Sequence, residues 1–251
     1  MQFIDMHTHL QDKRLSDIDK IIKNAQENGI EHFVICGTRQ EDWGKVAQIH
    51  DKYKDITTPS FGIHPWFIES VDDNWKTELN SYLDKYPDAF IGEIGLDKWK
   101  EGIKDKKEKQ IEIFAYQYEL AKEKNRKVVI HCIKAWGWFN KFLYKNRVPE
   151  KFMFHSFNGS AETANKICKA GGYISLSASI LRNKAKDRIL EMIPNDKLLI
   201  ETDSPDQSPY KGQINTPDNL LYIAKKIADI KDIDINDLAK NTYQNSTGFI
   251  K

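Results

Sequence analysis

Short apolar runs alternate with longer amphipathic segments along the whole chain. The runs are rich in Val, Ile and Phe and occupy residues 3–5, 32–36, 60–63, 89–93, 127–131, 152–155, 172–176 and 197–201. Continuous runs of this kind are typical of parallel strands that are buried on both faces. The segments between them show helical periodicity, as in the spacing of Ile18, Ile21 and Ala25. The pattern therefore predicts strands and helices in regular alternation.

Eight strands separated by helices are the number that closes a (β/α)8 TIM barrel, so we expect an α/β fold with a parallel eight-stranded barrel. An open doubly wound sheet would usually have fewer strands and a glycine-rich nucleotide loop after its first strand. Here the first strand leads into residues 5–9, DMHTH, which contain no glycine. The amphipathic segments 219–230 and 235–243 would complete the outer ring. We therefore expect residues 1–251 to form a single domain.

Composition narrows the class of protein. Charged residues make up 30% of the chain and apolar residues 40%, which is typical of a globular protein and unlike a membrane-embedded or disordered one. The 38 Lys and Arg residues nearly balance the 37 Asp and Glu residues. This balance excludes a polybasic protein that coats nucleic acid by charge alone.

The cysteines and the first residues of the chain indicate the cellular compartment in which we expect the protein. Cys36, Cys132 and Cys168 are too few and too scattered for a disulfide framework. The chain enters its first apolar run without the basic and apolar segments of a signal peptide, and no apolar stretch is long enough to span a membrane. We therefore expect a cytoplasmic protein with no membrane attachment and no obligate protein partner.

Ionisable side chains gather at the ends of the predicted strands, where barrel enzymes build their active sites. They follow or end strands one, four, five, six and eight, and they are His7, His9, Glu93, His131, His155 and Asp203. Because side chains in a strand alternate between its two faces, His7 and His9 share a face, as do Glu201 and Asp203. We expect the six side chains to converge on one point.

Four imidazoles and two carboxylates form a suitable ligand set for divalent ions such as Mg, Mn, Zn or Ni. Six ligands exceed the need of one tetrahedral ion, whereas two ions that share a bridging carboxylate would use all six. Paired ions activate a water molecule and stabilise the leaving oxygen. The set therefore predicts hydrolysis of a phosphoester, or of an acyl or amide bond.

The remaining histidines differ in their positions. His64 follows the third strand in the motif GIHP, on the same face as the ligand set, and is a candidate for substrate binding. His32 begins a strand and His50 lies on a helix, so no role is expected for either. Asp5 has the same inward parity as His7, and we expect it to orient a ligand.

Seven motifs in order along the chain resemble the TatD-type metal-dependent hydrolases, a branch of the amidohydrolase superfamily. They are FIDMHTHL at 3–10, GIHP at 62–65, IGEIGLD at 91–97, VIH at 129–131, FHSFNGS at 154–160, YIS at 173–175 and IETDSP at 200–205. The resemblance covers essentially the whole chain. It implies a TIM barrel with one or two metal ions and, for several members, deoxyribonuclease activity, often as a 3′–5′ exonuclease.

The resemblance also implies a role for each ligand. His7, His9, Glu93 and Asp203 would hold one ion, and Glu93 would bridge to a second ion held by His131 and His155. Asp203 would also take the proton of the nucleophilic water as general base. Many amidohydrolase relatives bridge their metals with a carboxylated lysine, whereas Glu93 at this position favours the TatD-like branch.

Three segments depart from the family pattern, and two of them lack an arginine that the family usually has. Residues 132–134 read Cys-Ile-Lys where Ser-Arg and an acid are usual, residues 98–99 read Lys-Trp where an aromatic pair is usual, and residues 211–212 read Lys-Gly where Arg-Gly is usual. Lysine does not grip phosphate in the bidentate way that arginine does. Lys134 and Lys211, which lie in the segments without arginine, are candidates for substrate binding. Arg182 and Arg39 follow strands on the same face and are further candidates, because they could replace the missing arginines.

Aromatic residues follow the predicted strands on the same face. Trp66, Trp99, Trp136 and Trp138 lie after strands three, four and five. Unpaired bases stack on aromatic side chains without regard to sequence, so some of these rings are candidates to line a substrate cleft.

Three functions are consistent with these patterns. We expect a divalent-metal-dependent hydrolase that acts as a deoxyribonuclease on DNA ends or on a small phosphoester. The alternative is a metal-dependent acyl, amide or aminoacyl-tRNA ester hydrolase, which the missing arginines would suit. A metal-binding scaffold without turnover is disfavoured, because Asp203 is available as a base.

Overall fold

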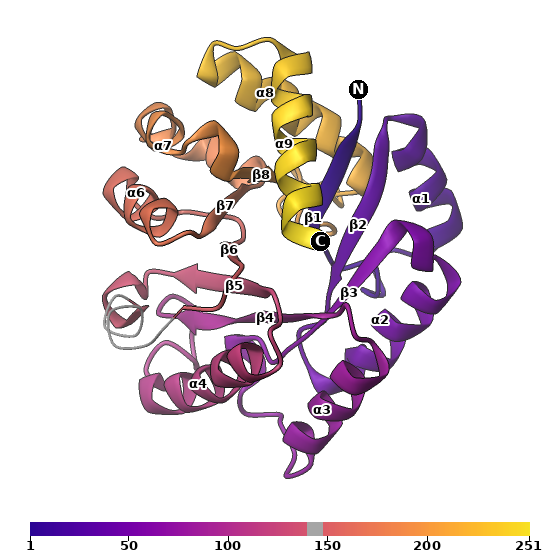
Figure 1. Cartoon of the computed structure of the whole chain (residues 1–251), viewed down its shortest axis with the longest axis vertical. Helices are drawn as coiled ribbons and strands as arrows, with labels where there is room; N and C mark the ends of the chain where they lie inside the picture. Colours follow the sequence, from indigo (N-terminus) through magenta and orange to yellow (C-terminus); the bar gives the residue numbers. More distant parts are fainter. Residues whose placement is uncertain (140–147) are drawn as a thin grey trace.

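Eight parallel strands form one sheet in which each strand pairs with the next along the chain. The computed structural model describes residues 1–139 and 148–251. The strands are β1 (Phe3–Thr8), β2 (Ile30–Cys36), β3 (Thr57–Phe61), β4 (Phe90–Asp97), β5 (Val128–Ile133), β6 (Phe152–Phe154), β7 (Tyr173–Leu176) and β8 (Leu198–Ile200). Figure 1 shows them arranged around a common axis, as the predicted barrel requires.

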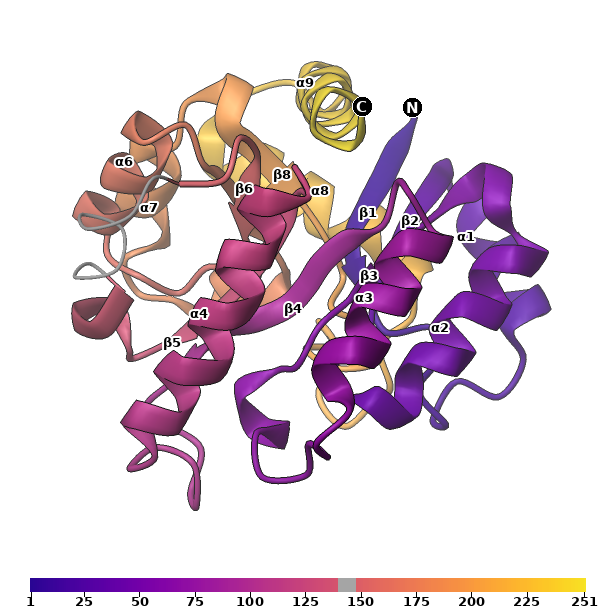
Figure 2. The ribbon, with the colours of Figure 1, turned by 60° about the horizontal axis from the view of Figure 1, so that its bottom comes forward.

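Helices surround the strands, as Figures 1 and 2 show. They are α1 (Ile18–Glu27), α2 (Gln40–Lys52), α3 (Trp75–Lys85), α4 (Lys107–Glu123), α6 (Ala161–Lys169), α7 (Lys186–Met192), α8 (Leu220–Lys231) and α9 (Ile235–Ile250). Within the described ranges, no helix is long and apolar enough to cross a membrane.

The seam between β1 and the segment after β8 closes the barrel. Thr8 and Ser204 form a parallel bridge. On either side of it, the Asp203 amide donates to the carbonyl oxygen of His7 at 3.0 Å and the His9 amide donates to that of Ser204 at 2.7 Å. The seam therefore runs through three of the predicted metal ligands.

The predicted strands are all present, and their limits differ by a few residues, most notably in the third and fourth strands. The third strand begins at Thr57, three residues before the apolar run at 60–63. Its first residues are Thr, Thr and Pro, which do not form an apolar run and so were not predicted as part of the strand. Glu93 does not end the fourth strand, since β4 continues to Asp97. It lies instead where the pairing of β4 with β5 shifts register, between Ile91 and Ile94, and such irregularities redirect side chains.

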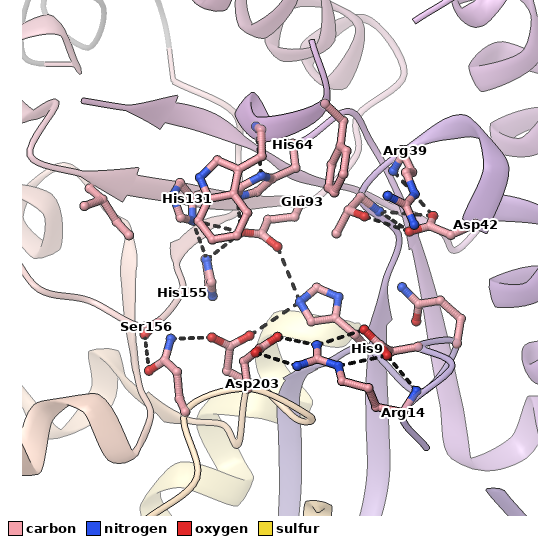
Figure 3. Close-up of a pocket in the computed structure, with 18 of the residues that line it drawn as sticks. His9, Arg14, Arg39, Asp42, His64, Glu93, His131, His155, Ser156 and Asp203 are labelled. Atoms are coloured by element: carbon pink, nitrogen blue, oxygen red, sulfur yellow. Dashed lines mark hydrogen bonds and ion pairs between the residues drawn. The ribbon is translucent and has the colours of Figure 1, made fainter. Parts of the chain in front are cut away.

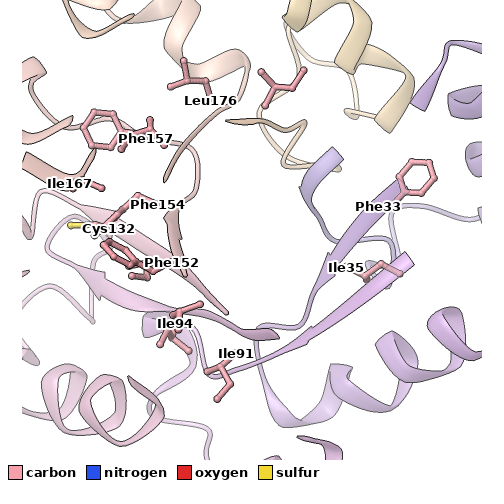
Figure 4. Packing of buried hydrophobic residues seen from close by; sticks show 14 of the residues in the cluster. Phe33, Ile35, Ile91, Ile94, Cys132, Phe152, Phe154, Phe157, Ile167 and Leu176 are labelled. Atoms are coloured by element: carbon pink, nitrogen blue, oxygen red, sulfur yellow. The ribbon is translucent and has the colours of Figure 1, made fainter. Parts of the chain in front are cut away.

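The apolar core has two parts. The larger part fills the space between the barrel and the helices, and Figure 4 shows some of its residues, among them Phe33 on β2 and Phe154 on β6. The smaller part fills the inside of the barrel. It consists of Ile4, Met6, Val34, Cys36, Phe90, Val129, Met153, Leu199 and Phe249.

Phe249 of α9 closes the end of the barrel where the strands begin, and its side chain is completely buried among the inward-facing residues. We expect Phe249→Ala to lower the free energy of unfolding by about 3–5 kcal/mol, because it leaves a cavity in this part of the core. Phe249→Leu should lose less. Chemical denaturation would measure both losses, and an unchanged midpoint for Phe249→Ala would contradict the role of this ring.

Candidate metal centre

The six predicted ligands meet inside the end of the barrel where the strands finish, and Figure 3 labels all of them except His7. They are supplied by five strands or the residues directly after them: His7 on β1 and His9 just after it, Glu93 on β4, His131 on β5, His155 after β6 and Asp203 after β8. Five of the six are buried, and the side chain of His9 is 13% exposed. The convergence inferred from strand periodicity is thus present.

Glu93 lies at the centre of the cluster, with its two oxygens facing different histidines. Oε2 lies 3.4 Å from Nε2 of His7 and 3.6 Å from Nε2 of His9. Oε1 lies 3.0 Å from Nδ1 of His131 and 2.7 Å from Nε2 of His155. One carboxylate therefore contacts two separate groups of imidazoles.

Hydrogen bonds outside the cluster fix the tautomers of two of these rings. Nδ1 of His9 lies 2.7 Å from the carbonyl oxygen of Cys36, which can only accept, so this nitrogen carries the proton. Nδ1 of His155 faces Oε1 of Glu201 at 3.3 Å in the same way. In the neutral form of each ring, the lone pair of Nε2 therefore points at Glu93.

His131 is oriented by Asp97. Its Nε2 lies 3.2 Å from Oδ2 of Asp97, which leaves the lone pair of Nδ1 directed at Glu93 and at Nε2 of His155, 3.1 Å away. Carboxylates that hold the far nitrogen of a ligating histidine are a regular feature of metal sites. Lone pairs and carboxylate oxygens converge here on one small region, so the donor set fits divalent metal ions.

The charges of Glu93 and His7 agree with this fit. Burial alone would raise the pKa of the Glu93 carboxyl group, but His155 and His64 outweigh burial and hold the pKa well below its ordinary value. Burial, assisted by the charge of His155, lowers the pKa of His7. Glu93 is therefore ionised and His7 neutral, which are the forms that bind metal.

Asp203 faces the same side of the cluster as His7 and His9. Its Oδ1 lies 3.6 Å from Nε2 of His7 and 3.4 Å from Nε2 of His9. Burial would raise the pKa of Asp203, but the hydrogen bond with His9 and the charge of His155 outweigh burial and lower it. The group is therefore an ionised carboxylate at neutral pH.

His64 also reaches the cluster, but its proton is on Nε2, whereas the protons of His9 and His155 are on Nδ1. Its Nδ1 accepts a hydrogen bond from the backbone N–H of Trp66 at 3.1 Å, so the proton is on Nε2, which donates to Oε1 of Glu93 at 3.1 Å. Burial lowers the pKa of His64 to about 4, so the ring is neutral. This arrangement makes His64 a hydrogen-bond donor beside the cluster, with no lone pair directed at it.

Asp5 does not contact a histidine ring, contrary to its expected role. Its carboxylate accepts from the backbone N–H of Thr202 at 2.9 Å and from the Thr202 hydroxyl at 2.5 Å. Its remaining contact is with the backbone N–H of His7 at 3.4 Å. Asp5 therefore holds the segment after β8 against β1 and does not orient an imidazole.

A pocket of about 900 Å³ opens above the cluster. Its cationic lining residues are Lys13, Arg14, Arg39, Lys45 and Arg182. Of the four candidates for substrate binding beyond His64, Arg182 and Arg39 line the pocket, whereas Lys134 and Lys211 are exposed side chains that do not. The positive charge at the pocket therefore comes mainly from the segments after β1 and β2.

Arg14 is a pocket residue that sequence reasoning missed. Its guanidinium pairs with Asp12, with Nη2 2.9 Å from Oδ2, and with Asp206, with Nη1 2.9 Å and Nη2 2.7 Å from the two carboxylate oxygens. Asp206 is 192 residues away along the chain. Only the closed barrel brings these two loops together, so no local pattern indicates the contact.

Of the four tryptophans predicted as candidates, Trp66 lines the pocket beside Phe67. Its indole N–H donates to Oδ2 of Asp97 at 2.7 Å, and Asp97 in turn orients His131. Trp136 and Trp138 pack against the larger core cluster. Trp99 is exposed and is not a lining residue of the pocket.

Residues 4–251 match the family model described as TatD related DNase. This chain belongs to the TatD-related DNase family. The resemblance expected from the seven motifs is thus confirmed. The family match begins at Ile4 on β1 and runs to the end of the chain, so it includes all six residues of the candidate metal centre.

Several proteins are similar to this family member over nearly their whole length. The chain is 28% identical to a human deoxyribonuclease named TATDN3, covering 97% of this chain and 92% of the relative. It is 30% identical to an uncharacterized metal-dependent hydrolase of Methanocaldococcus jannaschii, covering 100% and 98%. The crystal structure of YjjV, a TatD homologue from Escherichia coli, superposes with a TM-score of 0.92 at 24% identity, covering 98% and 97%. These likenesses confirm the barrel fold and agree with the use of divalent metal.

Proposed function

We propose that this chain is a divalent-metal-dependent deoxyribonuclease that hydrolyses phosphodiester bonds at DNA ends. The single observation that carries the proposal is the position of Glu93, whose two oxygens face two groups of histidines. We assign His7, His9 and Asp203 to one ion and His131 and His155 to a second, with Glu93 between them. Residues 1–251 would act as one domain.

Two divalent ions bound there would supply positive charge that polarises a phosphodiester and makes water a stronger acid. The protein supplies the proton acceptor, because Asp203 is ionised and its Oδ1 faces the cluster. His64 is neutral and donates its Nε2–H to Glu93, so it would hold the orientation of this carboxylate. Asp97 and Glu201 hold the rings of His131 and His155 in the orientation needed for ligation.

The lining of the pocket supports a nucleic-acid end as substrate. Guanidinium groups pair with phosphate oxygens in a bidentate way, and those of Arg39 and Arg182 line the pocket. Trp66 and Phe67 offer aromatic surface for an unpaired base. The human relative is named a deoxyribonuclease, and an acyl or amide hydrolase is not favoured.

Degradation of DNA tests the proposal. We expect the purified protein, loaded with Mg²⁺ or Mn²⁺, to shorten a fluorescently labelled single-stranded oligonucleotide in steps of one nucleotide, and EDTA to abolish the reaction. Separate 5′ and 3′ labels would give the polarity. A metal-loaded protein that leaves single-stranded and nicked DNA intact would contradict the proposed function.

Metal binding should also stabilise the fold. A cation present at 100 times its Kd would add about 2.7 kcal/mol to the free energy of unfolding, which for a chain of this size raises Tm by about 5–10 °C. Burial alone would lower the pKa of His9, but Asp203 and Glu93 outweigh it and raise the pKa to about 9. The ion must displace this proton, so the rise in Tm should be smaller at pH 6 than at pH 8.

Thermal denaturation with and without Mn²⁺ or Zn²⁺, followed by EDTA, measures this effect. The identity of the stabilising ion would follow from comparing Mg²⁺, Mn²⁺, Zn²⁺ and Ni²⁺ in the same assay. A Tm that none of these ions changes would be incompatible with a metal centre.

A further inference from the structure

The two carboxylate oxygens of Asp203 have different surroundings (Figure 3). Oδ1 faces Nε2 of His7 and Nε2 of His9, at 3.6 and 3.4 Å. Oδ2 accepts a hydrogen bond from the side-chain amide of Gln207. One oxygen is therefore directed at the metal centre, while the other is held by a residue four positions further along the same loop.

The orientation of the Gln207 amide follows from its partners. A carboxylate can only accept a hydrogen bond, so the NH2 group must face Asp203 and the carbonyl oxygen must face away. This oxygen accepts from the hydroxyl of Ser177 at 2.6 Å and from that of Ser156 at 2.9 Å. The hydroxyl of Ser179, 2.9 Å from that of Ser177, completes the group. Both ends of the amide are therefore satisfied, and the amide has one orientation.

The backbone of this group is unusual as well. Among the residues that the structure describes, six that are not glycine have a positive φ. Three of the six belong to this contact group: Ser156 at 41°, Asp203 at 57° and Gln207 at 53°. Left-handed backbone is unfavourable for such residues and persists where surrounding contacts hold it. The loop after β8 is thus held in a conformation that brings Gln207 back to Asp203.

We propose that Gln207 is a positioning residue that fixes the Asp203 carboxylate with Oδ1 directed at His7 and His9. The proposal rests on the proposed function, in which Asp203 accepts the proton of the attacking water. Without the amide, the carboxylate could rotate about its χ2 torsion to angles at which neither oxygen is directed at His7 and His9, and the fraction of molecules with a correctly directed oxygen would fall.

A neutral amide suits this task. It donates a hydrogen bond without contributing a full positive charge, so it orients Asp203 and leaves the carboxylate able to accept a proton. A Lys or Arg at the same place would stabilise the ionised carboxylate and make it a weaker base. The effect of Gln207 should therefore appear in kcat and in the affinity for metal, while KM stays unchanged.

The test compares Gln207→Leu with Gln213→Leu. Gln213 lies in the same loop, is exposed and is not a lining residue of the pocket, so the second variant makes the same chemical change without touching Asp203. We expect Gln207→Leu to lower kcat by about 10–100-fold, the range found when groups that orient metal ligands are removed. KM should remain within twofold of wild type, and Gln213→Leu should match wild type in both.

Titration of Mn²⁺ by calorimetry gives a second readout that does not depend on activity. Gln207→Leu should weaken Mn²⁺ binding by about 10-fold in the wild-type background. In the Asp203→Asn background it should weaken binding less than twofold, because a residue that acts through Asp203 loses its effect when the carboxylate is absent. Ser177→Ala, which removes one of the two donors to the Gln207 carbonyl, should give a smaller loss than Gln207→Leu.

Three results would overturn the proposal. These are a kcat of Gln207→Leu within twofold of wild type, an increase of KM alone, and an equal loss of Mn²⁺ affinity in the two backgrounds. Rates are measured on single-stranded DNA and on an activated aryl phosphodiester. If wild type cleaves only the aryl diester, the proposed DNA substrate is wrong. The comparison of Gln207→Leu with wild type on the aryl diester still tests whether Gln207 positions Asp203.

Discussion

Replacing Glu93 with Gln is expected to abolish both metal retention and hydrolysis, with a loss in kcat of at least about 10³-fold, equivalent to several kcal/mol of transition-state stabilisation. The side chain keeps its size but loses its charge, and one of its two oxygens becomes an NH2 group. Since each Glu93 oxygen faces a different group of histidines, this change would weaken both halves of the centre at once. Elemental analysis after gel filtration would measure the bound metal, and initial rates would measure activity.

Glu191→Gln is the matched control, because Glu191 is an exposed residue of α7. It should keep the metal content and the rate of wild type. Full metal occupancy in Glu93→Gln would show that the histidines and Asp203 suffice, and Glu93 would then have no bridging role.

Replacing Asp203 with Asn is expected to lower kcat by roughly 10²–10⁴-fold, the usual contribution of a general base. The amide cannot accept the proton of water, yet it keeps the shape of the side chain. A metal content of at least half that of wild type is expected, because His7, His9 and Glu93 remain. Single-turnover rates at saturating Mn²⁺ would separate the loss of the base from the loss of metal.

Asp187→Asn, on the exposed side of α7, controls for the change in charge and should behave as wild type. If Asp203→Asn lost its metal completely while regaining wild-type rates at high Mn²⁺, Asp203 would be a ligand and not a base.

Much of the fold was predictable because each strand is buried on both faces. Such strands need continuous apolar residues, and the eight runs mark them clearly in the sequence. The limits of a strand were predicted wrongly where its buried residues are polar. Thr57 and Thr58 begin β3 and are buried, but they are polar and do not stand out.

The convergence of the six candidate ligands was predictable because residues at the ends of parallel strands meet, whatever lies between them in sequence. The roles of the residues that surround these six side chains could not be predicted from the sequence. Gln207 is an ordinary polar residue of a loop, and its function depends on serines that lie 30 and 51 residues away. Lys134 and Lys211 were proposed from their place in family motifs, which does not reveal where a flexible side chain points.

The seam that closes the barrel joins β1 to the segment that carries Asp203. The two amide hydrogen bonds across it belong to His9 and Asp203 themselves. Local opening of this seam would therefore separate His7 and His9 from Asp203. An ion bound between them would in turn suppress the opening and slow hydrogen exchange at both amides. Metal release would then be coupled to local opening of the barrel, and the residence time of the ion would depend on the fold as well as on its ligands.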